Sequence, residues 1–123
     1  MLEIQTVRYQ QIYKKIMDVD PKIRFVTIID STGRLMFGGQ REGITNHLKP
    51  DYQKESLRQA LDSWEQRNKY SGSIGEGKYA FAEYGKIKRI TIPLDKKHLV
   101  YVTTEVEADH TMIIKEILDI LGK

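Results

Sequence analysis

The stretch Asp20-Pro21-Lys22-Ile23-Arg24-Phe25-Val26-Thr27-Ile28-Ile29-Asp30, followed by Ser31-Thr32-Gly33, decides the fold. Residues 23–29 are β-branched and aromatic, with apolar side chains at both odd and even positions, which indicates an interior strand covered on both faces. Asp30-Ser31-Thr32-Gly33 predicts a hairpin turn, because Asp30 can bond the backbone two residues on and Gly33 can adopt a left-handed conformation. A short return strand over residues 34–37 follows, and Gly38-Gly39 ends it.

Three amphipathic helices are expected around this hairpin, because apolar residues recur there at spacings of three and four. They span residues 2–19, 50–69 and 110–121. The first helix ends near Asp20, since a residue that precedes proline is pushed out of the α region. Pro50 suits the first turn of the second helix, and Asp109 suits the N-cap of the third.

Three more strands are expected between the second and third helices. They span residues 78–84, 87–94 and 99–106, after a flexible turn region over residues 71–77. The last strand is apolar on both faces, as residues 23–29 are, so we expect these two strands to touch at the centre of one antiparallel sheet. The predicted fold is α+β, with element order α-β-β-α-β-β-β-α and strand order 2-1-5-4-3. The terminal helices share one face, and helix 50–69 covers the other.

The composition suits a single folded domain over residues 1–123. Hydrophobic residues make up 40% of the chain and charged residues 30%, and the formal net charge of +3 is too mild to predict nucleic-acid binding by itself. The absence of cysteine excludes disulfides, thiolate metal sites and cysteine catalysis, and it fits a cytoplasmic location. No apolar run approaches the roughly 20 residues of a membrane span, and residues 1–5 lack the features of a secretory signal. We expect no membrane insertion and no cofactor.

This layout resembles the Roadblock/longin-type domain, a profilin-like fold, over nearly the whole chain. The matching features are an apolar first strand, an Asp-x-x-Gly hairpin, a helix of about five turns and a three-strand meander. The leading and closing helices favour Roadblock over longin, and residues 20–30 also resemble a group of short, uncharacterised archaeal proteins. The resemblance implies a non-catalytic homodimer, with paired central helices or joined edge strands, that often partners a Ras-like small GTPase. It carries no catalytic residue onto this sequence.

The strand expected over residues 78–84 ends the predicted strand order, so it is a sheet edge. Natural edges are normally blunted by charge, proline or bulges, but Glu83 is the only charge inside this strand. We expect the strand to pair with the same strand of a second copy, and aromatic residues are enriched at such interfaces. The alternative is that loop 39–49 or a helix covers the edge. The predicted interface residues are Tyr79, Ala80, Phe81, Ala82 and Tyr84.

A small-residue side of helix 50–69 is a second candidate for a dimer contact. It consists of Ser56, Ala60 and Ser63, which could admit a close helix partner. The simpler interpretation, an ordinary solvated face, is favoured there. Trp64 falls on the same stripe as the leucines of this helix, so we expect it in the core rather than at a ligand.

A basic set of residues lies on the hairpin over residues 86–97. Its members are Lys86, Lys88, Arg89, Lys96 and Lys97, with only Asp95 opposing them. Such a set could bind an anion, an acidic partner or a nucleic acid. A solvated hairpin whose lysines suppress aggregation is the favoured interpretation, because no nucleic-acid recognition motif accompanies the charges.

The remaining motifs predict neither catalysis nor a metal site. Gly72-x4-Gly77-Lys78 has the spacing of a phosphate loop, but it follows a helix and opens a strand, the reverse of the required context. An acidic run with one imidazole could offer ligands to a divalent cation, although Asp109 more simply caps the last helix. The members of this run are Glu105, Glu107, Asp109 and His110.

Three functions are compatible with this sequence. The leading one is a non-catalytic, homodimeric protein-interaction module that serves a Ras-like small GTPase as adaptor or regulator. The first alternative is a PAS-like small-molecule sensor, which needs an interior cavity between the sheet and helix 50–69. The side chains expected in that layer are large, which favours a filled core, and they include Phe25, Phe81 and Trp64.

The second alternative is a nucleic-acid binder that uses the basic hairpin 86–97. An enzyme is not expected, because no nucleophile, base and orienting group converge by a recognised spacing.

Overall fold

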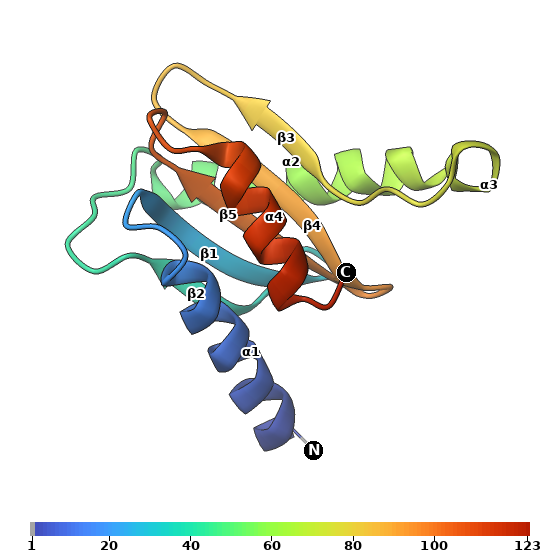
Figure 1. The fold of residues 1–123 in the computed structure, drawn as a ribbon, viewed down its shortest axis with the longest axis horizontal. Helices are drawn as coiled ribbons and strands as arrows, with labels where there is room; N and C mark the ends of the chain where they lie inside the picture. Colours follow the sequence, from blue (N-terminus) through green and yellow to red (C-terminus); the bar gives the residue numbers. More distant parts are fainter. Residues whose placement is uncertain (1) are drawn as a thin grey trace.

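Strand β1 (Ile23–Asp30) lies inside a five-stranded antiparallel sheet in the computed structural model, which describes residues 2–123 (Figure 1). The other strands are β2 (Leu35–Gln40), β3 (Ala80–Glu83), β4 (Lys88–Asp95) and β5 (His98–Thr104). Their order in the sheet is β2-β1-β5-β4-β3, which confirms the order predicted from the sequence. β1 and β5 are direct neighbours, as their apolar residues on both faces require.

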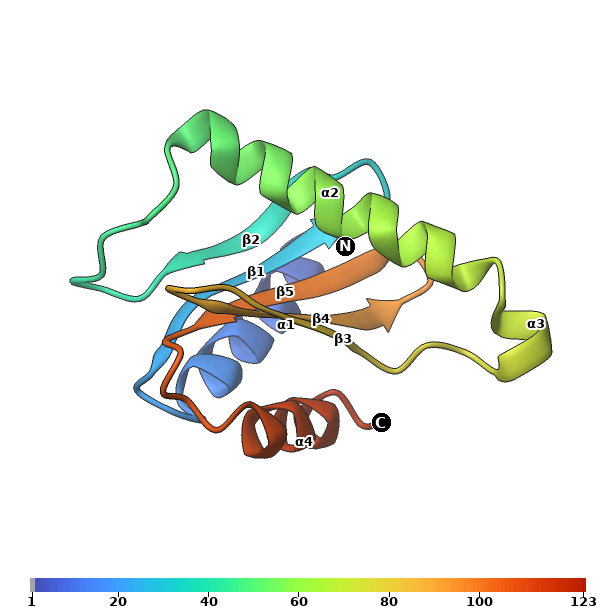
Figure 2. The ribbon, with the colours of Figure 1, turned by 90° about the horizontal axis from the view of Figure 1, so that it is seen from above.

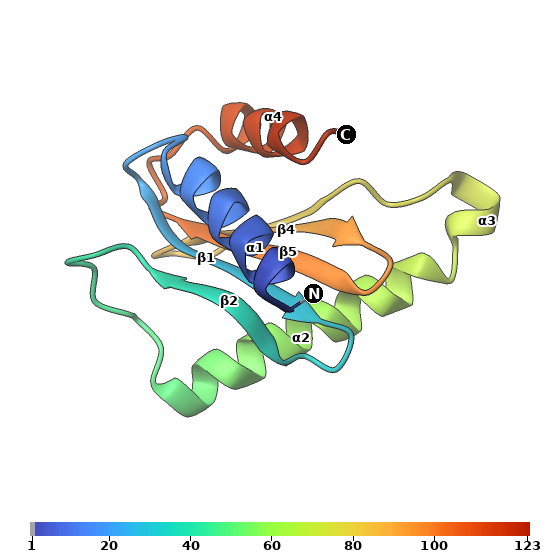
Figure 3. The same cartoon turned by 90° about the horizontal axis from the view of Figure 1, so that it is seen from below.

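Helices cover both faces of this sheet (Figure 2). α1 (Leu2–Met17) and α4 (His110–Ile120) lie on one face, and α2 (Pro50–Asn68) lies on the other, which confirms the predicted layering (Figure 3). A short helix, α3 (Ser71–Ile74), follows α2. Asp109 caps α4 as predicted, because its carboxylate accepts a hydrogen bond from the Met112 backbone N–H at 3.1 Å.

Two apolar cores result, one on each side of the sheet. In β1, the side chains of Val26 and Ile28 pack into the core beneath α1 and α4, whereas Phe25 and Ile29 pack beneath α2. Alternate residues of a strand point to opposite faces, so a strand that feeds two cores must be apolar at both parities. Trp64 is buried in the α2 core, as predicted.

The β1–β2 turn is held by the side chain of Asp30. Its Oδ1 accepts hydrogen bonds from the Thr32 hydroxyl at 2.6 Å, the Thr32 N–H at 2.9 Å and the Arg34 N–H at 3.0 Å. These hydrogen bonds hold the pKa of Asp30 below its ordinary value, and the bond from the Thr32 hydroxyl has the largest effect. Gly33 has a φ of 86°, so the predicted left-handed residue is confirmed.

The second strand is longer than predicted. β2 continues through Gly38 and Gly39, which pair with Thr27 and Val26 of β1, instead of ending before them. Glycine at these positions does not stop the strand, since β2 lies at an edge and Gly38, with a φ of 125°, sits directly against the β1 backbone.

The region between α2 and β4 also differs from the prediction. Residues 71–74 form α3 rather than an irregular turn, and β3 covers residues 80–83 rather than 78–84. Gly75, with a φ of 92°, turns the chain after α3, and Gly77 then packs against the Trp64 ring. Residues 75–79 therefore run alongside α2 before the chain joins the sheet. α1 and β5 each end two residues earlier than predicted, at Met17 and Thr104, and α2 and α4 each end one residue earlier.

Candidate interaction site

β3 forms an edge of the sheet and pairs with β4 alone. Two exposed tyrosines flank it, Tyr79 before the strand and Tyr84 after it, with exposed fractions of 48% and 49%. Ala80, and with it Ala82, faces the α2 side of the sheet, and both are half-buried. Loop 41–49 joins β2 to α2 at the opposite edge (Figures 1 and 2). The predicted edge strand therefore keeps an open side, although its tyrosines lie at its ends rather than within it.

Phe81 lies on the other face of the sheet from the one expected. Phe81 is expected between the sheet and helix 50–69, but it packs against the core beneath α1 and α4. Its ring is stacked on His110, with ring centroids 4.2 Å apart and planes inclined by 18°. The stacking fastens the edge strand to the beginning of α4, so Phe81 supports β3 from behind rather than offering itself to a partner.

Lys88 is buried, contrary to its expected place in a solvated basic hairpin. Its exposed fraction is 7%, and its Nζ donates to the Ala108 carbonyl at 2.8 Å. The same Nζ lies 2.9 Å from Nδ1 of His110. Since a lysine ammonium has only donors, His110 accepts this hydrogen bond. Burial of the lysine is possible because these two acceptors replace water.

The basic set does not form one patch. Lys86 lies in the turn between β3 and β4, whereas Lys96 and Lys97 lie in the turn between β4 and β5, so an eight-residue strand separates them. The Arg89 guanidinium lies over the rings of Tyr84 and Tyr101, at 5.7 and 5.9 Å from their centroids. The antiparallel hairpin sends the charges to opposite ends, which sequence proximity alone does not show.

The small-residue side of α2 faces its own sheet. Ala60 is only 2% exposed and belongs to the α2 core, so it is not available to a second helix. Ser56 Oγ lies 2.9 Å from the Tyr101 hydroxyl, within hydrogen-bond distance. Ser63 accepts a hydrogen bond from Gln59 on the same helix and is half-buried. Of the three predicted contact residues, Ala60 is buried, whereas Ser56 and Ser63 are half-buried.

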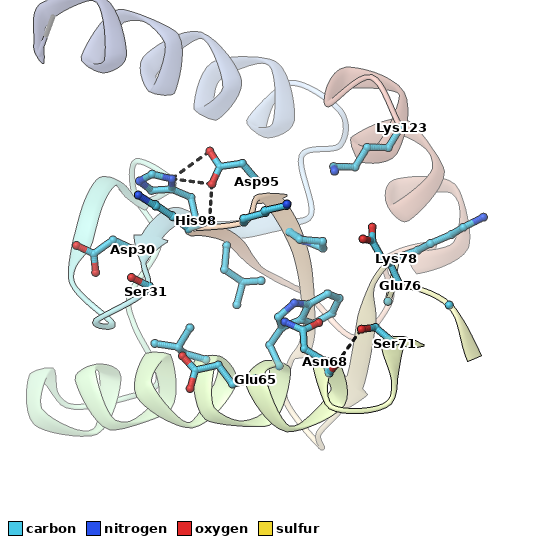
Figure 4. A pocket seen from close by; sticks show the side chains of 18 of the residues that line it. Asp30, Ser31, Glu65, Asn68, Ser71, Glu76, Lys78, Asp95, His98 and Lys123 are labelled. Carbon is cyan, nitrogen blue, oxygen red and sulfur yellow. Dashed lines mark hydrogen bonds and ion pairs between the residues drawn. The ribbon is translucent and has the colours of Figure 1, made fainter. Parts of the chain in front are cut away.

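A wide cleft of about 1060 Å³ opens beside the C-terminal half of α2 (Figure 4). It separates α2, α3 and residues 75–78 from the turn between β4 and β5, and the end of α4 also lines it. The layer between α2 and the sheet is itself filled by apolar side chains such as Phe25 and Tyr101, which are buried. The hollow thus lies beside the core and not inside it. The cleft could not be predicted from the sequence, because the path of residues 75–79 beside α2 depends on tertiary contacts such as that of Gly77 with Trp64.

Two side chains that line this cleft, Asp95 and His98, are hydrogen-bonded to each other, and His98 is also hydrogen-bonded to the buried Tyr9 of α1. His98 Nδ1 lies 2.9 Å from Asp95 Oδ1, and His98 Nε2 lies 3.2 Å from the Tyr9 hydroxyl. Burial raises the pKa of Asp95, but hydrogen bonds from the Lys97 N–H and from His98 outweigh it, so this pKa lies below its ordinary value. Tyr9 is 89 residues away from His98 in the chain, and only the fold reveals that α1 is tied to the β4–β5 turn.

The acidic run after β5 is divided among structural roles. Glu105 forms an ion pair with the buried Arg24 of β1, whereas Asp109 caps α4. Within residues 2–123, no group of three or more His, Asp or Glu side chains is placed to hold a metal ion. Across the same residues, no helix has both the length and the apolar character needed to cross a lipid bilayer.

One protein family has a sequence profile that matches residues 1–123, and its description is "Family of unknown function (DUF6659)". The chain is a member of DUF6659. No curated protein matches the sequence of this DUF6659 chain.

Solved structures show what the DUF6659 fold is similar to. A Roadblock/LC7 domain from Streptomyces avermitilis has 12% identity and a TM-score of 0.70, and the match covers 91% of this chain and 90% of that domain. The gliding protein MglB from Thermus thermophilus has 9% identity and a TM-score of 0.76, over 93% of this chain and 83% of its own. Profilin II from Acanthamoeba castellanii has 6% identity and a TM-score of 0.62, over 93% and 94%.

These likenesses show the fold alone, because all three identities are low. They confirm the predicted Roadblock-type, profilin-like architecture of the DUF6659 chain. The resemblance to short archaeal proteins stays a prediction. The open side of β3 and the cleft beside α2 are two surface features of this fold on which a function can be argued.

Proposed function

We propose that residues 1–123 act as one non-catalytic, homodimeric protein-interaction module. The observation that supports this is the open side of β3, a strand that contains one charge, Glu83, and is flanked by two half-exposed tyrosines. An unpaired row of backbone N–H and C=O groups is a template for another strand. A second copy supplies the matching strand, because a two-fold axis brings identical edges together in antiparallel pairing. The cytoplasmic location stays a prediction.

We propose in addition that the dimer serves a Ras-like small GTPase as adaptor or regulator. The support is the resemblance of the chain to Roadblock domains together with the shared fold. Pairing two β3 strands produces one continuous ten-stranded sheet, twice the five strands of one copy, and this gives a partner a broad composite surface. A nucleic-acid binder has weaker support, since the lysines of hairpin 86–97 lie at opposite ends of β4.

Replacing Ala82 by glutamate is expected to separate the dimer without unfolding the protomer. The new side chain faces Arg89 across the β3–β4 pair, which suits a negative charge within one protomer. In the dimer, the two-fold axis brings two such carboxylates to one strand junction, where repulsion and desolvation weaken association by at least about tenfold. Sedimentation equilibrium measures the change, from twice the 14.3 kDa chain mass to the chain mass itself.

Gly39→Glu is the matched control for this experiment. Gly39 lies on β2, the other edge of the sheet, and a side chain built there meets no atom within 4 Å. This variant carries the same added charge and should remain dimeric, with an unchanged circular dichroism spectrum. A wild-type chain that stays monomeric at high micromolar concentration contradicts the proposal, as does an equal effect of the two substitutions.

The partner class is tested by titrating a purified Ras-like GTPase from the same organism, loaded with GDP or a non-hydrolysable GTP analogue. We expect saturable binding that differs between the two nucleotide states, because a regulator must distinguish them. Ala82→Glu should weaken this binding at least about tenfold if the composite surface of the dimer is what the GTPase contacts. Absence of binding in both nucleotide states refutes the GTPase assignment and leaves the dimer unaffected.

A further inference from the structure

The cleft beside α2 has an apolar base, and an apolar side chain stands on each of two facing walls. Leu61, Trp64 and Leu99 form the base and are almost fully buried in the α2 core. Ile74, on the wall formed by α3, is 83% exposed, and Pro93 on the facing wall is half-exposed. The volume of about 1060 Å³ is just above the range typical of small-molecule sites, roughly 300–1,000 Å³. An apolar ligand body placed here covers the exposed isoleucine.

Lysines supply the positive charge of the cleft. Lys78, Lys96, Lys97 and Lys123 line it, and in the described residues 2–123 none of them forms an ion pair with a carboxylate. Figure 4 shows Lys78 and Lys123 on one side of the cleft. Each ammonium therefore retains donors for an incoming acceptor.

Carboxylates line the same cleft, but two of them are already bound by donors of their own chain. Asp30 accepts hydrogen bonds from Thr32 and Arg34, and Asp95 accepts them from Lys97 N–H and from His98. The others are Glu65, which lies with Asp30 on the side away from Lys123, and Glu76, which lies near Lys78 (Figure 4). These carboxylates disfavour the binding of a polyanion such as a nucleic acid, because their repulsion grows with each negative charge on the ligand.

We propose that this cleft binds a small organic monoanion with an apolar body, such as a carboxylate or a sulfonate. The apolar body lies over the base formed by Leu61 and Trp64, beside Ile74, and the anionic group meets the lysines of the β4–β5 turn. A charge-assisted hydrogen bond from Lys96 or Lys97 fixes the orientation. The site uses no residue of the β3 edge, so it does not depend on the proposed dimer.

The single tryptophan of the chain, Trp64, makes the proposal directly measurable. The probe is 1-anilinonaphthalene-8-sulfonate, an apolar ring system with one negative charge. We expect saturable quenching of Trp64 emission with sensitised emission from the probe. Octanoate should displace the probe, whereas inorganic phosphate should not, because phosphate lacks an apolar body. The neutral analogue N-phenyl-1-naphthylamine measures the contribution of the rings alone.

Two variants separate the charged and apolar contributions. Lys96→Gln with Lys97→Gln should raise the dissociation constant of the sulfonate about tenfold and leave that of the neutral analogue nearly unchanged. Ile74→Ser should weaken the binding of both probes. Lys14→Gln with Lys15→Gln, on the exposed side of α1, is the matched control and should change neither. Near-ultraviolet circular dichroism establishes that every variant is folded.

Three results overturn the assignment. They are the absence of saturable Trp64 quenching, displacement by inorganic phosphate at the same concentration as octanoate, and equal weakening by the two lysine double variants. Equal weakening shows that the overall charge attracts the probe and not the cleft. Sedimentation of the same samples reports the oligomeric state independently. A monomer that binds the probe therefore refutes the dimer and supports the site, whereas a dimer that does not bind it does the reverse.

Discussion

Replacing Gly38 by alanine is expected to lower the free energy of unfolding by about 3 kcal/mol or more, a large part of the stability of a chain this size. A Cβ at this position would lie 2.2 Å from the Val26 carbonyl oxygen and 2.6 Å from the Thr27 Cα. Both atoms belong to the backbone of the central strand β1, so no side-chain rotation relieves the overlap. The φ of 125° is also one that residues with a Cβ rarely adopt.

Gly39→Ala is the control, because a Cβ on the adjacent glycine meets no atom within 4 Å. This substitution should leave the stability unchanged or raise it by about 0.5 kcal/mol, since alanine has less conformational freedom in the unfolded chain. Urea denaturation followed by circular dichroism gives both free energies. Equal midpoints for the two variants contradict the argument, since they show that β1 and β2 can move apart to admit a methyl group.

The sheet could be predicted from the sequence because its central strands carry a strong and unambiguous pattern. Residues 23–29 and 99–104 are apolar on both faces, and only a strand covered on both sides tolerates that pattern. The ends of the elements depend on weaker signals. Gly38-Gly39 is typical of a break in a strand, but in the structure it allows close contact with β1. A single close contact of this kind depends on the neighbouring strand, which the local sequence does not describe.

The candidate sites were less predictable, because side-chain partners come from distant parts of the chain. Lys88 looks like a surface residue of a basic hairpin, and its burial depends on acceptors at Ala108 and His110. The exposed edge could be predicted, since it follows from strand order and from the scarcity of charge in β3. The cleft could not, because it exists only where residues 75–79 leave the sheet to follow α2 and pack Gly77 on Trp64.

Arg41 is a second position where the loss should be large, although the sequence indicates only a polar connection. Its Nε donates to the Ile23 carbonyl at 2.6 Å, and its Nη2 donates to the carbonyls of Met17 and Asp20 at 2.7 and 2.8 Å. These carbonyls lie at the end of α1, in the turn that follows and at the start of β1. One guanidinium therefore joins three points of the chain, and the Asp20 carbonyl also accepts the Ile23 backbone N–H at 3.1 Å.

Arg41→Ala is expected to lower the free energy of unfolding by about 2–3 kcal/mol, because three carbonyls lose a charged donor while the side chain is only half-buried. Arg41→Lys should recover less than half of this loss, since a single ammonium cannot reproduce the planar fork. Arg34→Ala is the matched control. The Arg34 side chain is 75% exposed and its nitrogen lies 3.8 Å from Asp30, so its removal should cost less than about 0.5 kcal/mol.

Urea denaturation midpoints measured with an unchanged slope compare the three Arg41 and Arg34 variants directly. The order of stability should be Arg34→Ala, then Arg41→Lys, then Arg41→Ala. If Arg41→Ala is as stable as Arg34→Ala, water satisfies the three carbonyls and the arginine does not hold the end of α1 against β1. The intermediate position of the lysine variant is the sharper test, because a general effect of positive charge would leave Arg41→Lys as stable as the wild type.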